Sequence, residues 1–434
     1  MTATFSNYSQ DLKLIPYWWE DAPVRPLPPV EMPAKVDVAI VGAGYGGLSA
    51  ALTLARGGRS VAVFDAGDPG EGASSRNGGA VGETLRVSFA DLTDRYGLDA
   101  AIAFYRDVRE GRAWLDRLIT GEAIDCRYAR VGRFVGCHKP GDYDRLARDL
   151  ELRQKHVGFD AVMVPKGQVH TMVGTDRYHG GRLIVSDGNL QPAMLHRGLL
   201  ERVMAAGGRV IGQARITAIA REGKNFVLTA GGRRIAAGNV VIATNGYTGR
   251  EWPWLRRRLI PIQSQIIATE PLPPAVISRL FPGNRQQGDT CNLHYYFRTS
   301  PDGTRILFGG RAGGHEIDDP RRSGIHLFRR MVELFPELAG TRITHSWAGF
   351  IAYTFDHLQH MSFHDGIHYV SGCCGSGVVM ATYLGHKTGL RVLGRPEAET
   401  AFDRPYRTRP FYTGTPWFMP AMIFYFGLRD RWRV

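Results

Sequence analysis

A glycine-rich turn between a short apolar run and a helical segment is the feature that most constrains how this chain folds. The run at residues 36–41 is mostly apolar and short, which is typical of a buried strand, and Gly42-Ala43-Gly44-Tyr45-Gly46-Gly47 follows it directly. Residues 48–56 then have helical spacing, and residues 60–64 form a second apolar run. This order predicts one compact βαβ unit with a dinucleotide-binding turn.

The glycines of this turn have distinct physical roles. Gly42 permits the tight turn, Gly44 lets a pyrophosphate approach the backbone, and Gly47 lets the helix pack on the strand. The helix N-terminus presents free N–H groups and the positive end of its dipole to the phosphates. Asp65 ends the second strand, 23 residues after Gly42, near the spacing expected for the acidic residue that binds ribose hydroxyls.

The motif alone does not distinguish NAD from FAD, and two further segments favour FAD. The loop at 72–79, GASSRNGG, is dense in small residues and lets a planar ring approach the backbone. A late apolar strand at 240–243 ends in the turn Thr244-Asn245-Gly246.

These segments resemble the FAD-dependent D-amino-acid oxidase superfamily, which includes the sarcosine and glycine oxidases. Within it, the chain is most similar to the γ-glutamylputrescine oxidase branch. The matching stretches run from Tyr17-Trp18 to residue 385, so the resemblance covers nearly the whole chain. They are residues 36–58, 72–79, 305–311, 347–361 and 366–385, and the tail from Pro416 also looks like that branch.

The resemblance implies an α/β fold plus an antiparallel sheet. A discontinuous Rossmann-like FAD-binding domain is expected over residues 35–90, 186–255 and 345–395. A substrate domain of mixed β-sheet and helices is expected over 91–185 and 256–344. Residues 1–34 are rich in proline and are expected to form an extended arm, and residues 396–434 form a C-terminal tail.

We expect noncovalent FAD. Sarcosine oxidases attach flavin through the Cys of a Cys-x-Tyr-Thr segment, which here reads Ile351-Ala352-Tyr353-Thr354. The vicinal Cys373-Cys374 pair is interpreted as small buried residues before a helix rather than as a redox pair. The expected cofactor contacts are Gly42, Gly44, Gly46, Gly47, Asp65, Ala66, Ser74, Ser75, Arg76, Asn77, Gly78, Gly79, Ile216, Ala243, Thr244, Asn245, Gly246, Gly349, Cys374, Gly375, Ser376, Gly377 and Val378.

For the substrate pocket we predict the catalytic residues Tyr353, His294, Tyr296 and Arg298. The last three alternate along a predicted strand and therefore share one face. Tyr353 matches the tyrosine that the superfamily places at its substrate pocket. Arg86 is a second candidate for binding a substrate carboxylate, because arginine forms bidentate pairs with carboxylates.

The resemblance implies hydride transfer from a primary or secondary amine to flavin, giving an imine that hydrolyses. A γ-glutamylated polyamine or an amino-acid-like amine is the expected substrate, and O₂, reduced to H₂O₂, is the expected acceptor. Sarcosine oxidases place a lysine over the flavin on a strand resembling residues 305–309, but this chain has no lysine between Lys224 and Lys387.

Several alternatives therefore stay open. Arg298, Arg311, His294 or His315 substitutes for the lysine, or another carrier takes the electrons and the enzyme is an amino acid or sarcosine-type dehydrogenase. A flavin-binding subunit with little activity of its own is a further alternative.

Composition and charge limit the classes of partner that we expect this chain to bind. The net charge is +13, but 47 of the 54 basic residues are arginines spread along the chain, which argues against a nucleic-acid-binding stripe. Five cysteines with no paired Cys-x-x-Cys predict neither a disulfide framework nor a metal site. No apolar run approaches the ~20 residues that a membrane span needs, and we see no secretory signal, so a cytoplasmic enzyme is expected.

The C-terminal tail is rich in aromatic and basic residues. Residues 415–434 combine an aromatic-rich run with Arg429, Arg431 and Arg433. This composition favours packing against the enzyme itself or a second subunit over lying on a membrane interface. A homodimer through the tail is one assembly that it predicts.

Overall fold

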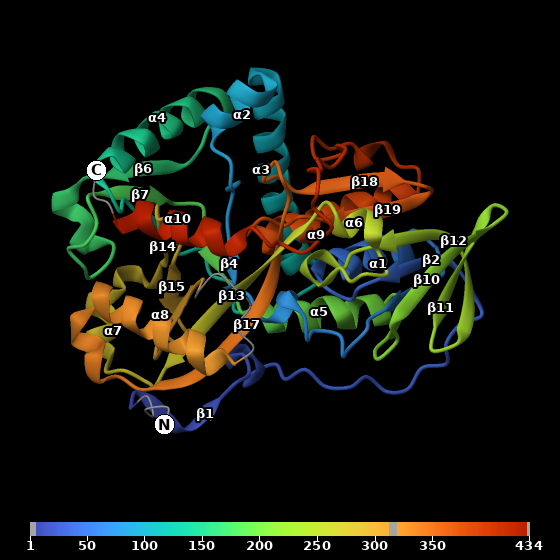
Figure 1. Cartoon of the computed structure of the whole chain (residues 1–434), viewed down its shortest axis with the longest axis horizontal. Helices are drawn as coiled ribbons and strands as arrows, with labels where there is room; N and C mark the ends of the chain where they lie inside the picture. The colour runs from blue at the N-terminus through green and yellow to red at the C-terminus, as the bar shows by residue number, and fades with distance from the viewer. Residues whose placement is uncertain (1–5, 312–318, 432–434) are drawn as a thin grey trace.

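Two large β-sheets organise the computed structural model of the protein, which describes residues 6–311 and 319–431 (Figure 1). The first sheet has eight strands and carries the glycine-rich turn. The second has nine strands and lies on the other side of the molecule. A two-stranded sheet, β4 (Ala80–Val81) with β8 (Gly188–Asn189), lies apart from both.

The eight-stranded sheet confirms the predicted βαβ unit. β2 (Lys35–Val41), α1 (Tyr45–Arg56) and β3 (Val61–Phe64) form it, and β2 and β3 pair in parallel. The parallel part continues through β9 (Arg209–Ile211) on one side, and through β12 (Arg233–Ile242) and β19 (Ile367–Ser371) on the other. The remaining strands are antiparallel additions: β10 (Ile216–Glu222), β11 (Asn225–Ala230) and β18 (His360–His364).

Three helices bury one face of this sheet. α1, α5 (Pro192–Ala205) and α9 (Gly377–Val392) share an apolar cluster that includes Leu48, Leu199 and Met380. α1 and α9 approach closely because small residues meet, since a Cβ added at Gly385 would lie 2.2 Å from the carbonyl oxygen of Gly46. This contact brings the N-termini of both helices to the same edge of the sheet.

The nine-stranded sheet is mixed, and most of its pairs are antiparallel. Its central strands are β17 (Ile343–Tyr353), β13 (Ile260–Thr269), β16 (Ile306–Gly310) and β15 (Tyr296–Thr299). One face packs on α8 (Pro320–Leu334) through Ile267, Phe308 and Leu327. The outer strands are β1 (Tyr8–Lys13), β14 (Gln286–Asp289), β5 (Arg133–Gly136), β7 (Gly181–Ile184) and β6 (Ala161–Val164).

The opposite face of the nine-stranded sheet packs toward the first sheet. Ile266, Leu307 and Trp347 belong to the same apolar cluster as Leu48 of α1. The N-terminal arm contributes Trp18, which is fully buried in that cluster. The two sheets therefore share one core rather than folding around separate ones.

Several boundaries differ from the sequence-based expectation. β17 belongs to the nine-stranded sheet, although the expected FAD-binding domain included residues from 345 onward. Within the expected substrate domain, α2 (Phe89–Tyr96) and α3 (Leu98–Gly121) are separate helices, because Gly97 between them has φ +86°. The arm is extended in part but forms β1 and a 3₁₀ turn at Tyr17–Trp19.

The tail also contains a helix that sequence patterning did not predict. α10 (Met419–Arg431) follows an irregular stretch and packs on its own chain (Figure 1). The expected homodimer through the tail stays a prediction. The remaining helices are α4 (Pro140–Val157), α6 (Pro253–Arg256) and α7 (Pro274–Leu280). Over residues 6–311 and 319–431, none of the helices combines the length and the apolar character needed to cross a bilayer.

The packing of α9 on α1 makes stability depend on pH. His386 shares a 2.9 Å hydrogen bond with the Thr53 hydroxyl and stacks on Trp114. Burial lowers the pKa of His386 to about 4. The unfolded chain therefore binds more protons than the folded one between about pH 6.5 and 4, so stability falls as the pH falls through that range.

We expect His386→Gln to lose less stability than the wild type on acidification from pH 7 to 4.5. The difference should be on the order of 1 kcal/mol, measured by urea unfolding at each pH. His170→Gln is the control, because that side chain is exposed in a 3₁₀ turn. Equal pH dependence in wild type and His386→Gln would contradict this assignment.

Candidate active site

The glycine-rich turn leaves no room for side chains at three positions. Gly42 has φ +103°, and a Cβ there would lie 2.9 Å from the carbonyl oxygen of Ala243. A Cβ at Gly47 would lie 1.9 Å from the carbonyl oxygen of Gly42, so the first turn of α1 rests directly on the loop. Gly44 caps α1, and its Cβ would meet the Ser74 hydroxyl at 3.0 Å. The sequence-based roles of these glycines agree with this geometry.

A hollow opens at the N-terminus of α1, where the ends of β12 and β19 meet the turn. The predicted residues Gly44, Gly46, Ser74, Ala243 and Asn245 lie in its wall. Sequence reasoning missed the residues that the other strands and α9 contribute. They are Gln359, Val370, Ser371, Cys373, Met380, Ala381 and Leu384, with Tyr45 completing the lining. The parallel pairing of β12 and β19 places them there, since parallel strands end at one edge of a sheet.

Asp65 braces the turn from the end of β3. Its Oδ2 accepts a 2.7 Å hydrogen bond from the Ala43 amide, and its Oδ1 accepts one from the Gly67 amide. Burial raises the pKa of this carboxyl group above its ordinary value. Ala66 follows it in the chain. Ile216 is instead a buried core residue that clusters with Phe64 and Ile242.

The small-residue loop at 72–79 is held mainly by its own polar side chains. Ser74 accepts a hydrogen bond from the Tyr45 amide, which ties the loop to the first turn of α1. Asn77 accepts from the Gly79 amide at 2.8 Å, and Ser75 accepts from the Trp19 indole. Arg76 donates to the carbonyl oxygen of Ala348 in β17 and lies over Trp19. Ser75, Arg76 and Asn77 thus shape the loop, whereas Ser74 lies in the wall of the hollow.

Arg298 also anchors this loop. Its guanidinium is buried and donates to the carbonyl oxygens of Leu190, at 2.8 Å, and Gly78, at 3.4 Å. It lies 5.5 Å from the ring centroid of Trp18, and burial lowers its pKa to about 9. These contacts join β15 to the backbone of the loop. The catalytic role predicted for Arg298 has no contact in this arrangement to support it.

The turn after β12 joins the turn after β19. Asn245 has φ +44°, its Oδ1 accepts from the Gly372 amide at 2.9 Å, and its amide donates to the Cys373 sulfur. Gln359 donates to the carbonyl oxygen of Cys373, while its buried Oε1 has no hydrogen-bond partner among the described residues. Thr244 bonds to Thr248, and Gly246 packs against the carbonyl oxygen of Phe350.

Cys374 is a structural residue in this turn. Its side chain is buried, its amide donates to the carbonyl oxygen of Ala352, and burial raises its pKa to about 12. Such a thiol carries no thiolate at neutral pH. This supports interpreting Cys374 as a packing residue, whereas Cys373 lies in the wall of the hollow.

The N-terminus of α9 comes next to Tyr353, the last residue of β17. Gly375 has φ +93°, and a Cβ there would lie 3.8 Å from the Tyr353 hydroxyl oxygen. Ser376 donates to the carbonyl oxygen of Thr84, Gly377 begins the helix, and Val378 is buried. The structure therefore brings a predicted catalytic residue and the predicted helix-end contacts to one place.

The electrostatic surroundings of Tyr353 are positive. Burial raises its pKa, and the charges of Arg86 and Arg311 oppose that rise. His357 packs edge-on against its ring at 5.9 Å, a neighbour that sequence reasoning missed because the turn that follows β17 places it there. His315, the other histidine considered as a substitute for the lysine, lies outside the described residues.

Tyr296 lies on the same face of the nine-stranded sheet as Tyr353, whereas His294 precedes β15 and does not show the alternation with Tyr296 along a strand that the sequence predicts. Register pairs Tyr353 with Ile260, Gly349 with Ser264, and Tyr296 with Gly309 along this face. The Tyr296 hydroxyl shares a 2.9 Å hydrogen bond with Ser264, and its ring meets Gly78. His294 lies 6.3 Å from the Tyr296 ring, and its Nδ1 is 2.8 Å from the carbonyl oxygen of Asp289.

Comparison with known proteins identifies the family of this chain. A model described as FAD dependent oxidoreductase matches residues 37–389 of the chain. The chain belongs to the FAD-dependent oxidoreductase family. The family membership and fold class expected from the sequence are thereby confirmed, and the cofactor of this oxidoreductase is FAD.

Similar proteins cover nearly the full length of this FAD-dependent oxidoreductase. It is 31% identical over 426 residues to a probable oxidoreductase OrdL of Rhizobium meliloti, covering 96% of this chain and 97% of that protein. It is 30% identical over 403 residues to the γ-glutamylputrescine oxidoreductase of Escherichia coli, covering 91% and 93%. The crystal structure of glycine oxidase from Geobacillus kaustophilus shares the fold, with a TM-score of 0.72, 23% identity and coverage of 85% and 97%.

The residues at the hollow fit the FAD of this oxidoreductase family. Gly44 keeps the backbone open at the N-terminus of α1, where a pyrophosphate would accept amide hydrogen bonds. The buried Gln359 Oε1, which has no partner among residues 6–311 and 319–431, offers an acceptor to a cofactor hydroxyl. The N-terminus of α9 lies beside Tyr353, and Gly78 of the small-residue loop lies against the ring of Tyr296.

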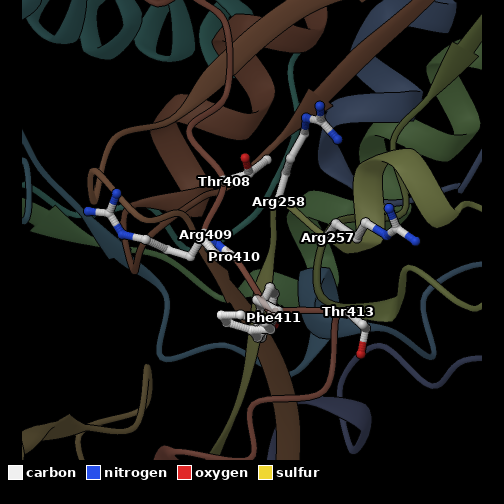
Figure 2. Close-up of a pocket in the computed structure, with 8 residues that line it drawn as sticks. Arg257, Arg258, Thr408, Arg409, Pro410, Phe411 and Thr413 are labelled. Carbon is white, nitrogen blue, oxygen red and sulfur yellow. The ribbon is translucent and has the colours of Figure 1, made fainter.

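A second hollow, of about 410 Å³, does not belong to this site. It lies between α6 and the tail and is lined by Arg257, Arg258 and residues 408–413 (Figure 2). The guanidinium groups of Arg257, Arg258 and Arg409 point in three different directions. They therefore do not converge on one anion.

Gly44→Val is expected to disrupt FAD binding. The Cβ alone would contact the Ser74 hydroxyl, and the added methyl groups would occupy the space needed for close phosphate approach. We expect FAD affinity to fall by roughly 100-fold or more, measured by flavin absorbance per protein after dialysis. Gly121→Ala is the control, because an added Cβ there meets nothing within 4 Å. Wild-type FAD content in a folded Gly44→Val variant would refute the assignment of the phosphate site.

Proposed function

We propose that this protein oxidises a primary or secondary amine bearing a carboxylate to an imine, and that the imine then hydrolyses. A γ-glutamylated polyamine is the preferred substrate. The observation that carries the proposal is the position of Tyr353, beside the N-terminus of α9 and in the positive field of Arg86 and Arg311. The full-length similarity to a γ-glutamylputrescine oxidoreductase supports the substrate class.

The reaction balances as a two-electron oxidation. The carbon beside the amine loses a hydride, the nitrogen loses a proton, and a C=N bond forms. Water then adds to the imine and releases an aldehyde and ammonia, or an amine if the substrate nitrogen is secondary. FAD, when bound, supplies the hydride acceptor, and the protein supplies orientation and electrostatics.

The side chains around Tyr353 suit substrate binding more than proton abstraction. Because burial raises the pKa of Tyr353, its hydroxyl stays protonated at neutral pH and can donate a hydrogen bond to a substrate. Arg86 is exposed to solvent and acts electrostatically on Tyr353. It can therefore pair with the carboxylate of a substrate that approaches from solvent. Tyr296, whose pKa burial raises to about 12, also stays protonated and holds Ser264.

The electron acceptor depends on what replaces the lysine of sarcosine oxidases. On the strand in question, β16, Leu307 is buried among apolar residues and no lysine is present. Arg311 follows this strand and acts electrostatically on Tyr353. We assign it the positive charge that assists reduction of O₂ to H₂O₂. The absence of a lysine from this strand equally favours a second candidate function, a dehydrogenase that transfers electrons to another carrier.

FAD is proposed to be noncovalent. Ile351 occupies the position of the attaching cysteine and offers no nucleophile. Acid precipitation should release all the yellow colour to the supernatant, and colour that remains on the protein would contradict this.

The function is tested by mixing the anaerobic yellow protein with a panel of amines. The panel contains γ-glutamylputrescine, free polyamines, sarcosine, and D- and L-amino acids. We expect γ-glutamylputrescine to bleach the flavin, and air to restore the colour with formation of peroxide. Bleaching without recolouring would make the enzyme a dehydrogenase. If no amine bleaches the flavin, the proposed amine oxidation is wrong.

Arg86→Gln is expected to weaken the binding of carboxylate substrates. A lost charge-assisted pair should raise KM for γ-glutamylputrescine roughly tenfold or more, while KM for putrescine changes little. Arg233→Gln is the matched control, because this exposed arginine lies at the opposite end of β12 from the hollow. An equal change in KM for both amines would show that Arg86 does not bind the carboxylate.

A further inference from the structure

The C-terminal helix α10 is unusual because it is apolar on all sides. Residues 419–428, MPAMIFYFGL, contain no charged side chain. A helix of this kind is expected to be buried on more than one side. Its outward residues Phe424 and Tyr425 are nevertheless 70% and 54% exposed, so contacts on its inner side hold it in place.

The start of α10 packs around the end of β17, where Tyr353 lies. Ile260, Tyr412 and Met419 form a buried cluster, and the Tyr412 hydroxyl donates to the carbonyl oxygen of Leu259 at 2.6 Å. Five partly buried side chains pack against this cluster. They are Ile262, Tyr353, Phe355, Phe418 and Ile423. The tail therefore builds an apolar surface beside Tyr353.

The end of α10 is pinned to the loop that precedes His294. The Asp430 carboxylate accepts hydrogen bonds from the amides of Asn292 and Leu293, both at 2.9 Å, and from the Asn292 side chain at 2.7 Å. Lys139 donates to the carbonyl oxygen of Arg429 at 2.6 Å, a favourable position for a cation at a helix C-terminus. The helix thus has a polar anchor at one end and an apolar one at the other.

These two anchors place α10 across the substrate face of the nine-stranded sheet. Tyr353 lies at one anchor, and His294 follows directly after the other. Thirteen residues of helix span about 20 Å, which is long enough to cross several strands. In the view of Figure 1, α10 lies in the left half of the molecule, with β14 below it and α9 to its right.

We propose that the inner side of α10 is a wall of the substrate pocket that binds the aliphatic chain of a long amine, with Ile423 as its specificity-determining contact. Ile260, Ile262, Phe355 and Phe418 continue this apolar surface. A methylene chain gains from such a surface by leaving water, whereas a one-carbon substrate does not reach it. The inference rests on the proposed function for the location of the site, and it deepens that function by naming how chain length is recognised.

The test compares chain lengths in the full-length holoenzyme. γ-Glutamyl-n-alkylamides with propyl, butyl and pentyl chains lack the terminal amine, and their affinities are read from the flavin absorption that ligand binding perturbs. We expect the wild type to bind each longer ligand about fourfold more tightly per methylene. Ile423→Ala should lower this factor to about twofold or less, whereas Phe424→Ala, on the exposed side of the same helix, should keep it.

The same variants are then tested with γ-glutamylated diamines of three, four and five carbons. Ile423→Ala should raise KM for the four- and five-carbon diamines more than for the three-carbon diamine, whereas Phe424→Ala should leave all three KM values unchanged. Two results would overturn the assignment of the wall. One is the same chain-length dependence in the wild type and Ile423→Ala, and the other is a chain-length dependence that Phe424→Ala weakens as much as Ile423→Ala does. Chain-length-dependent binding with no flavin reduction would instead overturn the proposed function alone.

A second variant tests the anchor without relying on turnover. Asp430→Asn loses the charge that accepts three hydrogen bonds, so the tail should be released more often. We expect trypsin to cleave within residues 404–431 at least severalfold faster than in the wild type, with weaker binding of all three alkylamides. Unchanged cleavage together with unchanged affinities would show that Asp430 does not hold the wall.

Discussion

The structure depends on the clamp that holds the loop at 72–79 between the two large sheets. Arg298 reaches it from β15, and the Trp18 indole of the N-terminal arm donates to the carbonyl oxygen of Asn77 at 2.8 Å. The Trp347 indole of β17 donates to the carbonyl oxygen of Arg76 at 2.9 Å. Three distant segments thus satisfy the backbone of one short loop. A buried polar group without a partner is costly, so this loop is tied to the relative position of both sheets.

The clamp also explains why the site lies where it does. The loop faces the N-terminus of α1 through Ser74 and faces Tyr296 through Gly78. The N-terminus of α1 and the face of the nine-stranded sheet that carries Tyr296 therefore both contact the same loop. Close packing of Gly42, Gly47 and Gly385 against backbone atoms fixes the position of the α1 N-terminus. The pairing of β13 with β17 fixes the facing surface of the nine-stranded sheet.

The local parts of this arrangement could be predicted from the sequence, and the long-range parts could not. The turn at Gly42–Gly47 and the loop at 72–79 are short-range patterns with a physical meaning of their own. The roles of Arg298 and Gln359 depend on which carbonyl groups distant segments bring to them. Placing β17 in the nine-stranded sheet required its pairing with β13, and α10 lacks the polar face by which a surface helix is recognised.

The order of the eight-stranded sheet has a consequence for synthesis on the ribosome. β2 is made early, but its neighbour β12 is made almost 200 residues later, and β19 and α9 complete the hollow only near residue 392. An emerging chain must therefore keep β2, α1 and β3 without β12 and α9 until those later segments have been translated. FAD can stabilise the fold only after that point, once the last residues that line the hollow have been made. Shortage of flavin would thus leave complete but poorly protected chains rather than truncated ones.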